Sequence, residues 1–574
     1  MTDLNLAYIP LTVICLILAR KIFIRLRLSR AKHPSLRGHS KMARRVAKQL
    51  KYFEYDESHF YNSDGAPDVV AKKRQVALSL LTQKIQKSTI KTSEFSQSMA
   101  SSISDVDFTS AHKVPFPYRK LLAKELKVGL VCEESSGVKV KDLDGNWYYD
   151  LSGSYGVNVF GYDFYKECMA KGIEKVQALG PVLGAYHPVI KENVDTIKSI
   201  SNKDEVSFHM SGTEAVMQAV RLARYHTGRS HLVRFCGSYH GWWDGVQVGI
   251  GNQRKTDDVY TLADMSENSL NILATRNDIA CVLINPMQAF HPNQDAPGDA
   301  TLIGSTRSSD LNREQYSLWL KQIRDVCTRR NIVLIFDEVF TGFRLAKGGA
   351  QEYFSINADM VTYGKTLGGG FPIGAVCGSH QLMKRFKEDA PANISFARGT
   401  FNSHPYVMGA MSEFLQRIQT PAIEQVYANA ELQWVSRVNN MNKRLQDEGL
   451  PIYMAHMHSV LSVQYTAPSR YNWMLQFYLR AHGLELSWTG TGRFIMSLAY
   501  TDQDFNEVVD KFIAACKQMQ ADGWWWQGTQ LSNKAIKRMM LVDVLKARFP
   551  ILNSVFSSDS YTHVNNTEQR GQSL

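Results

Sequence analysis

The hydrophobic and polar positions divide the chain into an apolar N-terminal segment, a polar stretch and a long region of alternating patterns. In the long region, from about residue 112, short apolar runs alternate with segments whose apolar residues recur at helical spacing. The apolar runs predict buried strands over residues 205–209, 231–235, 280–284, 332–336 and 360–363. Helices are predicted after Thr213 and over residues 314–329. Strands that alternate with helices indicate an α/β fold with a mostly parallel sheet.

The polar stretch, from residue 52 to about residue 111, has the composition of a connector with some helix. Its apolar residues over positions 76–85 are spaced as on one amphipathic helix. Residues 137–150 predict a β-hairpin with a tight turn at residues 144–146, Asp-Gly-Asn. A further helix is expected near residues 535–547, before a polar tail.

The N-terminal segment has the pattern of a membrane anchor. An apolar run extends from Leu4 to Ala19, with Asp3 before it and basic residues directly after it. A secretory signal peptide has its positive charge before the apolar run, and the positive-inside rule places the rest of this chain in the cytoplasm. A buried core helix or a frayed terminus is the alternative. We expect residues 1–28 to anchor the protein to a membrane, either spanning it or lying in its interface.

The charge of the chain is concentrated next to this segment. The chain has 66 Lys and Arg against 54 Asp and Glu, a formal net charge of +12. Twelve of the basic residues lie between Arg20 and Lys51, where there is no acidic residue, so the remaining chain is neutral. The basic stretch has few aromatic residues to stack on bases, so we expect no nucleic-acid partner. The eight cysteines lack metal-ligand spacing, so no metal site is expected.

A candidate anion site lies where a predicted strand leads into a helix. Ser211, Gly212 and Thr213 occupy this junction. The first N–H groups of a helix have no acceptor within the helix and attract anions, and small residues let a phosphate approach them. In isolation, the same residues are as well explained by a simple helix N-cap.

Three more candidate residues follow predicted strands. Asp337 ends an apolar strand, at the edge where open α/β sheets bind ligands, although helix capping is an alternative. Lys365 lies among glycines that permit close approach of a ligand, whereas an isolated lysine is ordinarily a solvated surface residue. Tyr239, in Ser238-Tyr-His-Gly-Trp242, offers an aromatic face to a flat ring.

Together these residues resemble the class III, fold type I pyridoxal-phosphate (PLP) aminotransferases, and especially the glutamate-1-semialdehyde aminomutase branch. The resemblance extends from about residue 112 to about residue 520. Its most specific element is Asp337-Glu-Val339, followed 28 residues later by Lys365 in a glycine-rich loop. Residues 238–245 and 396–405 add a likeness to aminotransferases of polyketide or prodiginine-type biosynthesis.

The resemblance implies a fold and a cofactor, PLP. The fold would be a large domain with a mainly parallel seven-stranded sheet, plus a small α+β domain. Lys365 would hold PLP as a Schiff base and later shuttle a proton. Asp337 would pair with the pyridine nitrogen and keep it protonated. Val339 would pack against one face of the ring and Tyr239 against the other.

The resemblance also implies how the rest of the cofactor is bound. Ser211, Gly212 and Thr213 would bind the phosphate, and His240 and Gln288 would complete the cofactor site. In the family, a threonine that matches Thr400 reaches the phosphate of the neighbouring subunit. A homodimer with shared active sites is therefore implied.

The expected substrate contacts are Tyr155, in a Gly-Ser-Tyr-Gly-Val motif, and Arg493. Arg493 is suited to bind a carboxylate, although a structural ion pair explains it equally well. Asn285 departs from the family, which ordinarily has a glutamate there, and this puts the usual substrate contacts in doubt.

These features predict six segments. In order, they are a membrane anchor (1–28), a basic juxtamembrane segment and connector (29–111), the first part of the small domain (112–180), the large PLP-binding domain (181–415), the second part of the small domain (416–525), and a helix with a polar tail (526–574).

The expected function is transfer of an amino group from a small amine donor to a carbonyl acceptor. The predicted anchor places the catalytic domain on the cytoplasmic face and suggests a lipid-like or carrier-bound acceptor. An intramolecular aminomutase of the glutamate-1-semialdehyde type is the nearest alternative. A membrane-anchored scaffold that keeps the fold without catalysis is the alternative from another class.

Overall fold

The computed structural model of the chain describes residues 3–35, 38–106, 113–126, 131–247, 249, 251–290, 309, 311–486, 492–528 and 531–550, and side chains from residue 12 onward. The chain divides into two compact units. The first comprises residues 1–44, 168–295 and 311–420, and the second comprises residues 45–167, 296–310 and 421–574.

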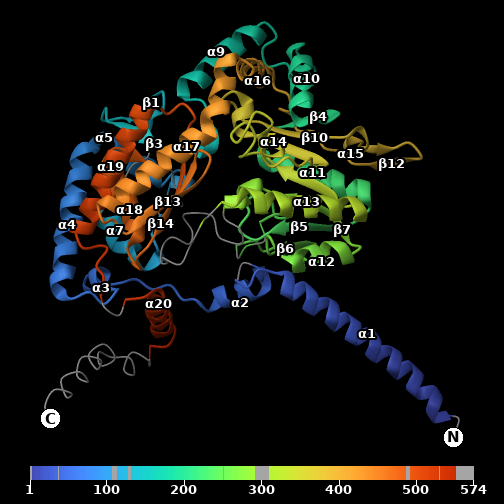
Figure 1. The fold of residues 1–574 in the computed structure, drawn as a ribbon, viewed down its shortest axis with the longest axis horizontal. Coiled ribbons are helices and arrows are strands. Elements are labelled where there is room, and N and C mark those ends of the chain that lie inside the picture. The colour runs from blue at the N-terminus through green and yellow to red at the C-terminus, as the bar shows by residue number, and fades with distance from the viewer. Residues whose placement is uncertain are drawn as a thin grey trace. The chain divides into compact units, whose positions relative to one another are not determined.

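A seven-stranded sheet forms the centre of the first unit (Figure 1). Its strands are β4 (Glu205–His209), β5 (His231–Phe235), β6 (Val259–Leu262), β7 (Ile279–Ile284), β8 (Val333–Asp337), β9 (Met360–Gly364) and β10 (Gly374–Gly378). The order across the sheet is β4-β10-β9-β8-β7-β5-β6. Only β10 pairs with its neighbours in antiparallel fashion. The sequence prediction of a mainly parallel seven-stranded sheet is confirmed.

Helices cover this sheet, so its central strands are buried along their whole length. Continuous apolar runs are typical of parallel strands that are covered on both faces. α11 (Gly212–Thr227) crosses β9 and β10 and presents Ala215, Ala219 and Ala223 to them, which lets its backbone lie close to the sheet. The other elements of the unit are α1 (Asp3–Ala31), α10 (Val189–Ser201), α12 (Glu267–Thr275), η3 (Pro286–Phe290), α13 (Arg313–Arg330), α14 (Gly349–Phe354), η4 (Lys365–Gly368), α15 (His380–Met383), β11 (Phe386–Lys387), β12 (Ala390–Ile394) and α16 (Pro405–Arg417).

The second unit contains two smaller sheets. One has the order β1-β2-β3-β15, where β1 is Cys132–Ser136, β2 Lys139–Asp142, β3 Trp147–Asp150 and β15 Leu484–Glu485. The other has the order β13-β14-β16, where β13 is Ile452–Met457, β14 Val460–Tyr465 and β16 Arg493–Ile495. β2 and β3 pair antiparallel and Gly145 between them has a φ of +85°, which confirms the predicted hairpin.

Helices surround these sheets. They are α3 (Glu57–Asn62), α4 (Asp68–Ser88), α5 (Ile90–Ala100), η2 (Phe116–Tyr118), α7 (Arg119–Glu125), α8 (Gly153–Gly156), α17 (Pro421–Asp447), η5 (Asn472–Met474), α18 (Leu475–Ala481), α19 (Asp502–Ala521) and α20 (Asn533–Arg548). Two further helices, α2 (Ser40–Gln49) and α9 (Tyr162–Val176), each have residues in both units.

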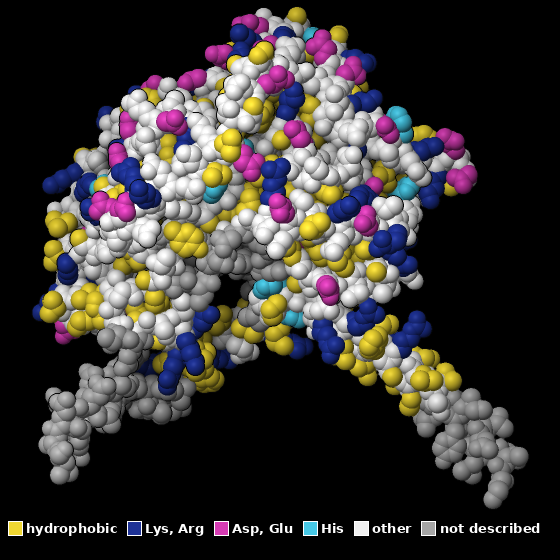
Figure 2. Space-filling view, viewed as in Figure 1, with side chains coloured by type: hydrophobic (Ala, Val, Ile, Leu, Met, Phe, Trp, Pro, Cys, Tyr) yellow, Lys and Arg dark blue, Asp and Glu magenta, His cyan; other side chains and the backbone are white. Residues whose placement is uncertain are grey.

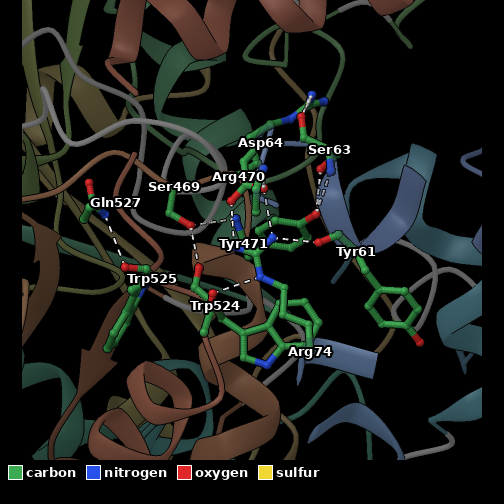
Figure 3. Close-up of polar contacts among 12 residues, drawn as sticks. Tyr61, Ser63, Asp64, Arg74, Ser469, Arg470, Tyr471, Trp524, Trp525 and Gln527 are labelled. Carbon is green, nitrogen blue, oxygen red and sulfur yellow. Dashed lines mark hydrogen bonds and ion pairs between the residues drawn. The ribbon is translucent and has the colours of Figure 1, made fainter. Parts of the chain in front are cut away.

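A buried ion pair joins α4 to distant parts of the second unit (Figure 3). The guanidinium of Arg74 donates to both carboxylate oxygens of Asp64, at 2.8 and 2.7 Å, and neither side chain is exposed. Arg74 also donates to the carbonyl of Gly523 at 2.9 Å, and its guanidinium carbon lies 4.5 Å from the ring centroid of Tyr471. Every charge of the pair is therefore matched, as burial requires.

Among the residues that the structure describes, no helix is long and apolar enough to cross a bilayer. The prediction of a membrane helix over residues 1–28 is therefore wrong, and so is the membrane-anchored location. Five basic residues lie within α1 itself, and hydrophobic side chains lie beside them (Figure 2). Each charge inside a bilayer costs about 2.5–3.5 kcal/mol. These basic residues are Arg20, Lys21, Arg25, Arg27 and Arg30.

Candidate active site

Five loops of the first unit leave the sheet at the same edge. The strands before them, β4, β5, β7, β8 and β9, all run in one direction, because only β10 is reversed. In open α/β sheets this carboxyl edge is where ligands bind. The predicted residues that lie at this edge are Ser211, Gly212, Thr213, Tyr239, His240, Gln288, Asp337, Val339 and Lys365.

Asp337 is held by three donors at the end of β8 and is 3% exposed. Its Oδ1 accepts from the backbone N–H of Val339 at 3.2 Å and from the hydroxyl of Thr362 at 3.3 Å. Its Oδ2 lies 2.7 Å from Nδ1 of His240. The carboxylate is thus fixed in position by groups from three separate strand ends.

His240 is the fully buried partner of this carboxylate. Burial lowers the pKa of His240 below its usual value, although the hydrogen bond to Asp337 acts in the opposite direction. A carboxylate can only accept, so Nδ1 of the neutral ring is the donor. Nε2 is then an acceptor, and it has no hydrogen-bond partner among the described residues.

The start of α11 is packed too closely for larger residues. The hydroxyl of Ser211 caps the helix by accepting from the N–H of Glu214 at 3.3 Å. A Cβ atom on Gly212 would lie 2.5 Å from a methyl group of Val339, and one on Gly241 would lie 2.3 Å from the hydroxyl of Thr213. The first N–H groups of the helix, those of Gly212 and Thr213, have no acceptor within it.

Lys365 begins η4, directly after β9, with a φ of +48°. A residue other than glycine is uncommon in this left-handed region, and such strain is concentrated at functional sites. Its Nζ lies 5.9 Å from the ring centroid of Phe340. Gly369 and Gly370, with φ values of +59° and +108°, complete the turn. The strained turn places the lysine beside the strand end that bears Asp337.

Gln288 is buried in η3 and donates its amide to the carbonyl of Cys236 at 2.7 Å. It therefore contacts the loop after β5, which leads to Tyr239 and His240. Asn285, the residue that departs from the family, donates to the carbonyl of Tyr239 at 3.1 Å. Both amide side chains thus brace this loop.

The structure does not bring together all the predicted residues. Tyr239 lies at the carboxyl edge, but its side chain is 62% exposed. Thr400 is exposed in a turn of the first unit. Tyr155, in α8, and Arg493, in β16, belong to the second unit. The roles of these residues in binding stay predictions.

Two residues that position the site were missed by the sequence analysis. Thr362 lies opposite Asp337 in the pairing of β8 with β9, and its hydroxyl reaches the carboxylate. Arg234, in β5, is half-buried and donates to the carbonyls of Ser238 and Val246, on either side of His240 in the loop after β5. A basic residue within an apolar strand was the available signal for Arg234.

The residues gathered at the carboxyl edge fit PLP. An anion-binding helix start matches the phosphate, and a buried, hydrogen-bonded carboxylate matches the pyridine nitrogen. Gly212 and Gly241 leave no room for a side chain at this helix start, so its backbone keeps one close-packed position. Lys365 provides a primary amine at the same edge of the sheet.

The chain is similar in sequence to known proteins. A sequence model of the family "Aminotransferase class-III" matches residues 122–516. Glutamate-1-semialdehyde 2,1-aminomutase of Methanocaldococcus jannaschii is 33% identical over 319 residues, 52% of this chain and 69% of that protein. The same enzyme of Citrifermentans bemidjiense is 30% identical over 367 residues, 60% of this chain and 78% of that protein.

Solved structures show the same fold. A transaminase with PLP bound matches with a TM-score of 0.62 and 24% identity, over 76% of this chain and 99% of the other. A glutamate-1-semialdehyde aminomutase of Pseudomonas aeruginosa matches with a TM-score of 0.62 and 15% identity, over 78% and 99%. The chain therefore belongs to the class-III aminotransferase family of PLP-dependent enzymes.

Proposed function

We propose that the protein transfers an amino group from an amine donor to a carbonyl acceptor at the carboxyl edge of the seven-stranded sheet. The observation that carries this proposal is the position of Asp337, which is buried, bonded by His240 and next to the strand end that bears Lys365. When bound at this site, PLP withdraws electrons from the substrate and makes its Cα–H bond acidic.

Asp337 and His240 would hold a proton on the pyridine nitrogen of the cofactor. Because His240 donates from Nδ1, it stabilises the ionised form of the Asp337 carboxylate. An ionised carboxylate next to the pyridine nitrogen favours the protonated form of that nitrogen. Thr362 and the N–H of Val339 fix the orientation of the carboxylate.

Lys365 would hold the cofactor covalently through Nζ and move a proton at the substrate Cα. Its amine must be uncharged to act as a nucleophile. The N–H groups of Gly212 and Thr213 would bind the phosphate and so orient the ring.

A lysine substitution tests this function. We expect Lys365→Ala to lose the absorbance of covalently bound PLP and all transfer activity, measured with a set of amines and carbonyl compounds. Lys321→Ala, at an exposed position in α13, is the matched control and should retain both. Full activity of Lys365→Ala would refute the mechanism, and inactivity of the wild-type protein toward every donor would favour the scaffold alternative.

An aminomutase is the second candidate, because the relatives reported above are glutamate-1-semialdehyde aminomutases at 30–33% identity. An aminomutase needs one substrate and no separate acceptor. Product formed from glutamate-1-semialdehyde alone would therefore favour the aminomutase. A strict requirement for a second carbonyl compound would favour the aminotransferase.

We also propose a homodimer in which Thr400 reaches the phosphate site of the partner subunit. Thr400 lies between two exposed aromatic residues, Phe396 at 69% and Phe401 at 51% exposure, which is the composition of an interface core. Light scattering should give twice the mass of the chain. Thr400→Val should lower PLP affinity, whereas Thr420→Val, also exposed but beyond α16, should not.

Tyr155 and Arg493 are proposed to contact the substrate. Arg493→Lys keeps the charge but loses the bidentate geometry. If Arg493 binds a carboxylate, KM for carboxylate substrates should rise while KM for neutral amines stays constant. A loss of thermal stability with unchanged KM would assign Arg493 to the structural ion pair instead.

A further inference from the structure

The second unit contains a cavity of about 580 Å³, within the range of small-molecule sites. Its walls come from α4, β3, the turn between α18 and β15, and α19. All these elements belong to the second unit, whereas the residues proposed to bind PLP belong to the first. The cavity is therefore separate from the PLP site.

One wall of the cavity is a buried arginine. Arg480 is 7% exposed, and its guanidinium carbon lies 3.7 Å from the ring centroid of Tyr148. Asp142 and Glu485 balance its charge. Its Nε is buried and has no hydrogen-bond partner among the described residues. This guanidinium, stacked on Tyr148 and facing two carboxylates, forms a fixed wall of the cavity.

A second wall provides an uncompensated positive charge. Lys511, in α19, makes no ion pair within the part of the chain that the structure describes. Its neighbour Asp510 also lines the cavity, but Asp510 is paired with Arg444 at 2.6 Å. Burial lowers the pKa of His482, the hydrogen bond to Gln518 acts in the opposite direction, and the positive charges of Lys84 and Lys511 lower it further. Lys511 is therefore the group of the lining that attracts an anion.

Trp147 provides an aromatic surface on the lining of the cavity. Its side chain is 41% exposed, although it lies in β3 next to the buried Tyr148. An exposed indole offers a flat face on which an aromatic ring can stack. The cavity thus combines a stacking surface with a free cation.

The α4 wall comes from a segment outside the family match. Ile85, Ser88 and Thr89 of α4 line the cavity, and the match to the family begins only at residue 122. Asn146 closes this side by donating to the carbonyl of Ser88 at 2.6 Å. The N-terminal segment thus has a role in building this cavity, which the matched region alone does not complete.

We propose that this cavity binds a small planar anion. An aromatic ring lies on Trp147, and a phosphate or carboxylate group meets Lys511. This binding site is independent of the amino-transfer site and does not require it to be active.

Calorimetric titration of the full-length, PLP-loaded protein tests the proposal, because PLP fills its own phosphate site. The probes are AMP, which has a phosphate, and indole-3-acetate, which has a carboxylate. Adenosine, which lacks the anionic group, and inorganic phosphate, which lacks the ring, serve as half-ligands. We expect saturable binding of at least one aromatic anion and at least tenfold weaker binding of both half-ligands.

Two variants locate the site. Lys511→Ala and Trp147→Ala should each weaken binding of the aromatic anion at least tenfold. Lys517→Ala is the control, because this lysine lies on the same helix and pairs with Glu448 outside the cavity. Thermal melting verifies that each variant is folded. The proposal is overturned if neither aromatic anion binds, if inorganic phosphate binds as tightly as AMP, or if Lys511→Ala and Lys517→Ala bind equally well.

Discussion

Asp337 and His240 show how single residues set the chemistry of the site. The carboxylate accepts from a backbone N–H, a hydroxyl and an imidazole, so its charge is stabilised although it is 3% exposed. These three donors fix the carboxylate in one orientation, which suits it to face a ring nitrogen of the cofactor.

Substitution of this carboxylate should affect catalysis more than folding. Asp337→Asn keeps the size of the side chain but removes the charge, so we expect a fall in kcat of about 100-fold or more. Asp325→Asn, on the exposed face of α13, should leave kcat unchanged. Steady-state kinetics with a working donor and acceptor measure both. An unaltered kcat for Asp337→Asn would contradict the assigned role.

Because of His209, the free energy of unfolding should fall at acid pH. It is buried in β4, and burial, assisted by Arg385, lowers its pKa to about 4. In the unfolded chain, His209 has its ordinary pKa of about 6.5. The unfolded state therefore binds a proton at a higher pH than the folded state does, and the folded state loses stability as the pH falls from about 6.5 toward 4. The expected loss between pH 7 and pH 4.5 is about 2–3 kcal/mol.

The measurement is the free energy of unfolding in urea at both pH values. His209→Gln cannot take up this proton, so the difference between pH 7 and pH 4.5 should shrink by about 2–3 kcal/mol. His380→Gln is the control, because His380 is exposed. An equal pH dependence in His209→Gln and the wild-type protein would count against this account.

At the scale of elements, the start of α11 is fitted against the residues that follow β8. The closest approach is between Gly212 and Val339, where an added Cβ would lie 2.5 Å from Cγ1 of the valine. Such a distance requires one of the two elements to move. Helix start and strand end therefore determine each other's position.

A double-mutant cycle tests this fit. Gly212→Ala should destabilise the protein by about 1–3 kcal/mol and weaken PLP binding, because overpacking displaces the helix start. Val339→Ala removes the obstructing methyl groups, so the double variant should recover part of both losses. Gly249→Ala, which has open space around it, should be neutral. Strict additivity of Gly212→Ala and Val339→Ala would show that the two positions are not coupled.

At the scale of the whole chain, the Arg74–Asp64 pair joins the N-terminal helices of the second unit to its C-terminal part. Arg74→Met should lower the free energy of unfolding by about 3–5 kcal/mol, because Asp64 would remain buried without its counter-charge. Arg74→Met combined with Asp64→Asn should be less destabilised than Arg74→Met alone. Lys72→Met, exposed on the same helix, should have little effect. If Arg74→Met lowers the free energy of unfolding less than Lys72→Met does, the buried pair does not have this stabilising role.

Much of the fold followed from local patterns. The apolar runs that became β7 and β8 predicted the parallel sheet, and Asp337 and Lys365 were identified because each ends or follows a strand. The buried pair of Arg74 and Asp64 was not predicted. Its partners include Gly523, 449 positions from Arg74, and polar residues in a polar stretch leave no periodic signal.

The N-terminal prediction failed for a different reason. An apolar run before basic residues is the pattern of a membrane anchor, but the pattern does not say whether the basic residues follow the helix or belong to it. In the structure Arg20 and Arg30 both lie within α1, which ends at Ala31. The end of that helix also packs on the first unit, where Ala31 accepts from the N–H of Ala263 at 2.8 Å.

The contact between Arg74 and Gly523 has a consequence for biosynthesis. A ribosome adds about 5–20 residues per second, so the 449 residues between the two positions take roughly 20–90 s to make. During that time Arg74 can already reach Asp64, but the Tyr471 and Trp524 rings that cover it do not yet exist. The nascent second unit therefore carries this charge pair uncovered until synthesis is nearly complete.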